Sequence, residues 1–184
     1  MIVATSAWTV VPIVVGAVTA IGTAVAGVVT WFINGVRDER TRLQKLYADA
    51  YSAVISYQEF PYMIRRRRAP GPSQEEVGNE ERLRISAALH TVQEALNNYL
   101  AQISMESSAV SAKYKALVRQ TRWVAGGYMR EAWQAPPLDN DAGMNIAGID
   151  YSELTTPQDE YLEAVKTDMS FWRVAFPRLR KKMP

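Results

Sequence analysis

Few side chains in this sequence are of the types that carry out catalysis. There is no cysteine and a single histidine, His90, so thiol nucleophiles and thiolate metal sites are excluded. Neither a His-x-x-x-His nor a Glu-x-x-His pair includes His90, and phosphate-binding glycine loops and nucleophile elbows are absent. An enzyme would need carboxylates to converge with His90 in one pocket, and the candidates are Glu80, Glu81, Glu94 and Glu106. We therefore expect a protein that is not an enzyme and that uses no cofactor.

The stretch Asp139-Asn140-Asp141-Ala142-Gly143 has some of the oxygen ligands of a calcium loop. An EF-hand requires an oxygen ligand at its fifth position, glycine at its sixth and glutamate at its twelfth. Those places hold Gly143, Met144 and Asp150. We expect an ordinary polar loop and no metal site.

The run Arg65, Arg66, Arg67 and Arg68 is the sharpest local charge feature. It can be a docking site for an acidic protein partner. It can equally be a solvated run at a helix end, where cations complement the helix dipole. A third interpretation pairs it with the acidic loop, whose members are Asp139, Asp141, Asp150 and Glu153. Nucleic acid is not the expected partner, because no aromatic side chains interleave with these arginines and the net charge is only +2.

The element before these candidates is an apolar N-terminal segment. Residues 1–36 contain no charged side chain, and the stretch from Ala7 to Ile33 exceeds the roughly 20 residues that cross a bilayer. Trp8 and Trp31 lie roughly 34 Å apart at helical rise, which suits the two membrane interfaces. The sequence predicts a single-pass transmembrane helix within residues 1–36.

Two alternatives compete with the predicted span. Ala24-Val25-Ala26 imitates a signal-peptide cleavage site, but the apolar run continues past it and no basic n-region precedes it. A buried core helix of a soluble protein is the second alternative, and it is disfavoured because the segment has no polar face.

Basic residues flank the predicted span on one side, and they predict its orientation. Arg37, Arg40, Arg42 and Lys45 follow the span, and no basic side chain precedes it. Positive flanks stay inside, so we expect the N-terminus outside and the remainder in the cytoplasm, anchored in the plasma membrane. The lack of cysteine agrees with a reducing compartment.

Small residues recur within the span at helical spacing, and they are Gly16, Ala20, Thr23, Ala24 and Gly27. Such a face lets two backbones approach closely, so it is the candidate surface for self-association into a homo-oligomer.

Residues 37–184 read as one all-α domain of about four amphipathic helices in an antiparallel bundle. Leu43, Tyr47, Ala50, Val54 and Tyr57 mark the first apolar face, with the coiled-coil-like steps of three and four. That helix can continue the span directly, with Asn34-Gly35 as a flex point, and Pro61 should end or kink it.

The remaining helices follow from periodic apolar residues and from helix caps. The second runs from Ile85 to Ile103, and the third begins at the N-cap Ser107. The fourth begins at Thr156 with Pro157 in its first position, and its expected face is Leu162, Val165, Met169, Trp172 and Phe176. Residues 69–79 form the expected linker, and residues 135–156 the expected long loop.

An up-down bundle would return the C-terminus to the membrane side. The second basic cluster, Arg178, Arg180, Lys181 and Lys182, would then lie beside Arg37 and Arg40 against the anionic inner leaflet. The four arginines and the acidic loop would lie at the far pole.

The layout, an uncharged N-terminal helix followed by Gly35-Val36-Arg37-Asp38-Glu39-Arg40 and a helical domain, resembles small single-span membrane proteins of high-G+C bacteria and their phages. That resemblance implies a role in phage exclusion, lysis or membrane-linked defence. The leading hypothesis is a membrane-anchored, non-enzymatic interaction protein. The alternative is a holin-like effector whose spans assemble and perturb the bilayer.

Overall fold

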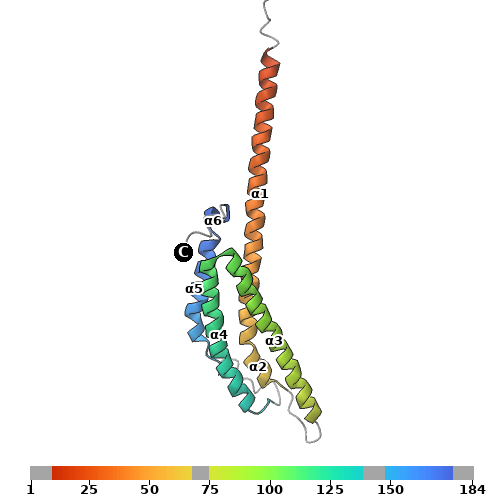
Figure 1. The fold of residues 1–184 in the computed structure, drawn as a ribbon, viewed down its shortest axis with the longest axis vertical. Helices are drawn as coiled ribbons and strands as arrows, with labels where there is room; N and C mark the ends of the chain where they lie inside the picture. The colour runs from red at the N-terminus through yellow and green to blue at the C-terminus, as the bar shows by residue number, and fades with distance from the viewer. Residues whose placement is uncertain (1–9, 68–74, 139–147, 176–184) are drawn as a thin grey trace, which may run out of the picture. The chain divides into compact units, whose positions relative to one another are not determined.

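The structure is a computed structural model that describes residues 10–67, 75–138 and 148–175. Within these ranges, side chains are described from residue 27 onward, except at residues 75–77 and 171. The described residues are helical and contain no strand, which confirms the all-α prediction. The elements are α1 (Val10–Gln58), α2 (Phe60–Arg65), α3 (Glu75–Glu106), α4 (Ser108–Gln134), the 3-10 turn η4 (Ser152–Leu154), α5 (Thr155–Asp168) and α6 (Phe171–Ala175) (Figure 1).

The chain divides into two compact units, residues 1–42 and residues 43–184. In the first unit, α1 continues through Asn34-Gly35 without a break, so the backbone does not bend away from the helix there. Val28, Trp31 and Ile33 are 65%, 76% and 57% exposed. Within the part of the chain that the structure describes, no helix combines the length and apolar character needed to cross a membrane.

The second unit is a helical bundle built around α4, which contacts α2, α3 and α5. The predicted first apolar face is confirmed, because Leu43, Tyr47, Ala50, Val54 and Tyr57 are at most 5% exposed. The chain reverses at Ser107, so that α3 and α4 lie side by side and antiparallel (Figure 1).

Local chemistry explains where these helices begin and end. Pro61 lacks an amide hydrogen, and α1 accordingly stops at Gln58 while α2 takes Pro61 into its first turn. The predicted N-cap is confirmed, since the Ser107 Oγ accepts a hydrogen bond from the Val110 amide at 3.4 Å. Residue Ala135, directly before Pro136, is extended (ψ 148°), and α4 ends at Gln134.

The expected fourth helix differs from the structure in its start, its length and its buried face. It begins at Thr155, so Pro157 is in its third position, and it ends at Asp168 before the separate α6. Leu162 and Trp172 are 46% and 67% exposed, whereas Tyr161 and Asp168 are 1% and 0% exposed. The face is rotated because Tyr161 and Asp168 form hydrogen bonds inside the bundle, which hydrophobicity alone does not signal.

Two segment boundaries also shift. Residues 75–79 of the expected linker belong to α3, which begins at Glu75. The expected loop of residues 135–156 contains η4 and the first turn of α5. Residues 68–74 and 139–147 lie outside the described ranges.

Candidate functional site: a cavity beside helix α2

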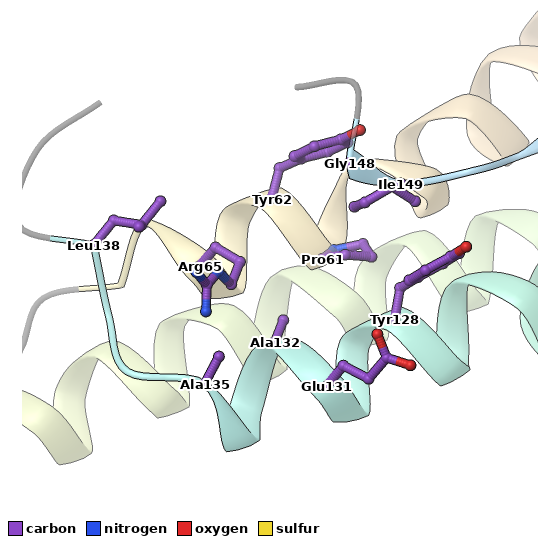
Figure 2. Close-up of a pocket in the computed structure, with 10 residues that line it drawn as sticks. All are labelled: Pro61, Tyr62, Arg65, Tyr128, Glu131, Ala132, Ala135, Leu138, Gly148 and Ile149. Carbon is purple, nitrogen blue, oxygen red and sulfur yellow. The ribbon is translucent and has the colours of Figure 1, made fainter. Parts of the chain in front are cut away.

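A cavity of about 300 Å³ opens between α2, the C-terminal part of α4 and the segment before η4. In Figure 2, Pro61 and Arg65 of α2 lie on the side of Tyr128 and Ala132 of α4, and Tyr62 projects from α2 toward Gly148. The lining of the cavity is completed by Glu131, Ala135, Leu138, Gly148 and Ile149. The proline that ends α1 therefore lines the same hollow as Ala135 and Leu138, which follow the end of α4.

Arg67 closes the wall of this region by binding the end of α4. Its Nη1 donates to the carbonyl oxygens of Ala132 at 2.8 Å and Ile64 at 2.9 Å. Its Nη2 donates to the carbonyl oxygens of Ala135 at 2.8 Å and Trp133 at 3.3 Å. The last carbonyls of a helix lack partners within it, so this guanidinium acts as a C-terminal cap supplied by the turn that follows α2.

The surroundings of Arg67 agree with this structural role. The guanidinium lies 5.0 Å from the centre of the Trp133 ring, within cation–π range. Burial, together with the positive charges of Arg65 and Arg82, lowers the pKa of Arg67 from its ordinary value. A guanidinium stays charged under these conditions, because its ordinary pKa lies far above neutral pH.

Arg65 differs from Arg67 because it lines the cavity and its guanidinium makes one hydrogen bond. Its Nη1 donates to the Pro136 carbonyl at 3.3 Å, and its own carbonyl accepts from the Leu138 amide at 3.0 Å. A guanidinium has five N–H donors, so Arg65 retains hydrogen-bonding capacity toward an anionic group in the cavity. Glu131, an exposed residue of the rim, forms no ion pair with Arg65.

Two tyrosines frame the other side of the cavity. The Tyr128 hydroxyl donates to the Asp150 carbonyl at 3.2 Å and accepts from the Asp150 amide at 3.3 Å, which fixes the segment after Ile149. Burial, and then the charge of Glu59, raise the pKa of Tyr62, so its phenol remains protonated at neutral pH. The cavity combines apolar walls with one cation and one carboxylate, an arrangement suited to binding a side chain or small ligand.

The structure separates the members of the predicted arginine cluster. Arg65 lines the cavity and Arg67 caps α4, whereas Arg66 is exposed and Arg68 lies outside the described residues. The side-chain hydrogen bonds of Arg65 and Arg67 go to backbone carbonyls. Of the acidic loop, Asp150 accepts from the Ser152 amide at 2.8 Å and Glu153 from Gln120 at 3.3 Å. Asp139 and Asp141 lie outside the described residues.

The other predicted site residues are partly described. Arg42 pairs with Glu39 and Lys45 with Asp49, each at 2.8 Å, while Arg37 and Arg40 are exposed. Of the small-residue face, Gly27 is exposed with open space where a Cβ would stand. The structure does not describe the other side chains of the small-residue face, which are those of Ala20, Thr23 and Ala24, or the surroundings of Gly16. The C-terminal basic cluster also lies outside the described residues, and its members are Arg178, Arg180, Lys181 and Lys182.

No family model, curated protein or solved structure matches the chain. The site must therefore be interpreted from its own geometry.

The carboxylates considered with His90 do not converge on it. Glu80 and Glu106 are both on α3, roughly 39 Å apart at helical rise. His90 forms an exposed surface pair with Glu94, at 3.2 Å, and Glu81 binds Arg84. Among the described residues, no group of three or more histidine and acidic side chains could hold a metal ion.

Sequence reasoning did not find Tyr62, Tyr128 or Glu131 as site residues. The sequence signal that could have indicated Tyr62 is the pair Pro61-Tyr62 directly before the arginines. A proline that ends one helix places the following aromatic and basic side chains on a separate short helix. Tyr128 and Glu131 carried no such signal, since their place depends on how α4 packs against α2.

Proposed function

We propose that this chain is a membrane-anchored, non-enzymatic interaction protein. Its N-terminal helix spans the plasma membrane with the N-terminus outside, and its helical unit presents the cavity beside α2 to a protein partner in the cytoplasm. The layout resemblance places this role in phage exclusion or defence.

The observation that carries the anchoring proposal is the uncovered apolar surface at residues 28–33 of α1. Val28, Trp31 and Ile33 are 65%, 76% and 57% exposed. Successive helical residues are about 100° apart, so these side chains cover more than half of the helix circumference, and no charged side chain lies among them. Exposed charges begin at Arg37, directly after this segment. Such an abrupt change is typical of a helix that leaves lipid for water.

The partner proposal is supported by the cavity. A hollow of about 300 Å³ with apolar walls can receive one large side chain of a partner, and Arg65 can bind a carboxylate next to it. The basic flank Arg37, Arg40, Arg42 and Lys45 faces the anionic leaflet in this proposal, which adds about 1 kcal/mol of attraction for each residue near the surface.

Alkaline carbonate extraction of cell membranes tests the anchor. The wild-type chain should stay in the pellet, and the double variant Val18→Lys, Val25→Lys should be released, because each charge at a span centre costs about 3 kcal/mol. The matched variant Val18→Leu, Val25→Leu should stay in the pellet. Release of the wild-type chain would contradict the anchor.

Because the chain has no cysteine, single cysteines report its orientation without a background. A membrane-impermeant maleimide should label Ser6→Cys in intact cells and Ser86→Cys only after permeabilisation. The reverse pattern would place the helical unit outside.

Photo-crosslinking in intact cells tests the partner interaction. A photoreactive residue at Glu131 should crosslink a discrete protein, and the same residue at the exposed position Ser104 should not. Arg65→Ala should abolish the crosslink without unfolding the chain. All four arginines should not be changed together, because loss of Arg67 would destabilise the unit itself. A crosslink that is unaffected by Arg65→Ala would exclude the cavity as the docking site.

A further inference from the structure

The outward face of α4 carries a line of basic residues with one large aromatic residue. Residues that follow a given position by four, seven, eight and fifteen residues lie on the same side of a helix as that position. Counted from Lys115, this side extends over roughly 22 Å. These side chains are Lys115, Arg119, Arg122, Trp123 and Arg130.

This face is unpartnered within the described bundle. Lys115, Arg119 and Arg130 are exposed, and no acidic residue shares their side of α4. Arg122 donates one hydrogen bond to the Asn97 amide oxygen at 3.0 Å, which is a neutral partner. Trp123 is 77% exposed, although an indole ring is among the most favourable groups to bury. A cationic surface with an exposed tryptophan is typical of a binding face.

An open groove of about 570 Å³ runs beside this face. Helix α4 contributes Arg122, Trp123 and Arg130 to its lining, and the wall formed by the η4 segment contributes Asp150 and Glu153. The Ser152 amide lowers the pKa of the Asp150 carboxyl, so this wall is negatively charged at neutral pH.

Two glycines leave the backbone of α4 open along the groove. A Cβ at Gly126 or at Gly127 would meet nothing within 4 Å, so packing inside the chain does not require either glycine. Each glycine costs about 1 kcal/mol of helix stability relative to alanine. Their position next to Trp123 allows the backbone of a partner to approach closely.

We propose that this groove binds an acidic, amphipathic segment of a partner protein. Carboxylates of the segment pair with Arg119, Arg122 and Arg130, and an apolar side chain packs on Trp123. This inference rests on the proposed function, because it assigns the partner's chemistry and a second contact surface next to the cavity, with which the groove shares Tyr128 and Glu131.

The groove is lined by both basic and acidic side chains, which favours a protein segment over other anionic partners. Nucleic acid and an anionic lipid surface present continuous negative charge, which the carboxylates of Asp150 and Glu153 repel. A single tryptophan also offers no platform on which successive bases stack. A protein segment can place acidic residues against one wall and a basic residue against the other.

Peptide selection on the full chain in neutral nanodiscs tests the groove. A random twelve-residue display library should yield peptides enriched in Asp and Glu together with an apolar residue. The double variant Arg119→Glu, Arg130→Glu should lose affinity for the best peptide at least tenfold, measured by fluorescence anisotropy, and should select basic peptides instead. Arg82→Glu, a charge change at an exposed site on α3, should leave the affinity unchanged.

The remaining outcomes overturn the proposal. Selected peptides without acidic enrichment, or with affinity that survives Arg119→Glu, Arg130→Glu, would exclude the groove. Tighter binding of oligothymidylate or of phosphatidylglycerol vesicles, in competition with the peptide, would assign the surface to nucleic acid or lipid. If the crosslink from Glu131 persists in the double variant while selection shows no charge preference, the interaction function stands and the groove alone is rejected. If the crosslink from Glu131 is lost and selection shows no charge preference, both the interaction function and the groove are rejected.

Discussion

At the scale of single residues, Arg65 and Arg67 show that adjacent members of one charge run have different roles. Arg67 donates to four carbonyl oxygens, three of them at the end of α4, whereas Arg65 donates to one and lines the cavity. The difference arises because α2 ends at Arg65, so Arg67 lies in the turn after the helix and its guanidinium reaches the end of α4. The arginine run is therefore neither wholly a docking site nor wholly a solvated surface.

Replacement of Arg67 by lysine should lower the free energy of unfolding by about 1–2 kcal/mol, because one ammonium cannot reach carbonyl oxygens that a guanidinium binds as a fork. Urea unfolding of the detergent-solubilised chain measures this loss. Arg119→Lys is the matched control and should change stability by less than about 0.5 kcal/mol. Equal stability of Arg67→Lys and wild type would show that the cap contributes nothing beyond its charge.

At the scale of elements, tyrosine hydroxyls join neighbouring helices to α1. Tyr161 of α5 donates to the Tyr47 carbonyl at 2.9 Å, and Tyr114 of α4 donates to the Ala50 carbonyl at 3.2 Å. Tyr47 in turn donates to the buried carboxylate of Asp168 at 2.7 Å. Asp168 is 0% exposed, so a carboxylate belongs to the interior of this bundle. These bonds fix how α4 and α5 are rotated against α1.

The buried tyrosines make the fold sensitive to alkali. Burial raises the pKa of both Tyr114 and Tyr161 above the ordinary 10.0. Because the folded state holds these protons more tightly than the unfolded state, stability is complete below pH 10 and falls as pH rises above it. Each tyrosine that ionises only on unfolding should steepen this loss by about 1.4 kcal/mol per pH unit.

The urea midpoint between pH 8 and pH 11 checks this expectation. Tyr161→Phe should be less stable at pH 8, because the hydrogen bond to Tyr47 is lost, and should show a shallower decline above pH 10. A midpoint that stays constant up to pH 11 would mean that the phenols ionise in the folded state.

At the scale of the whole molecule, residues 43–184 contain a core of their own. Leu43, Leu96, Leu117 and Leu154, which come from α1, α3, α4 and η4, are all 0% exposed. The unit 1–42 instead carries exposed apolar side chains, which are Val28, Val29, Trp31, Phe32 and Ile33. The two units therefore differ in whether their described apolar side chains are buried within the chain.

A fragment of residues 43–184 should therefore fold without detergent and unfold in one cooperative transition. Circular dichroism during thermal unfolding and size-exclusion chromatography measure this, with the full chain in detergent as the reference. A fragment that is helical but lacks a cooperative transition would show that residues 1–42 are needed for packing.

The sequence by itself determined the helical class, the first buried face and the caps at Pro61 and Ser107. These features depend on periodicity, a missing amide hydrogen and a short hydroxyl side chain, all of which act over a few neighbouring residues. The lack of charge in the N-terminal segment is likewise read directly from neighbouring residues, and its role as an anchor is our proposal.

Only the tertiary structure decided the rotation of α5, the role of each arginine and the position of the cavity. Hydrophobic periodicity assigned Leu162 and Trp172 to the core, but both are exposed because Tyr161 and Asp168 find hydrogen-bond partners on α1. Arg67 likewise caps a helix more than sixty residues away in the chain. Such contacts join residues that are distant in sequence, so no local pattern of residue types could specify them.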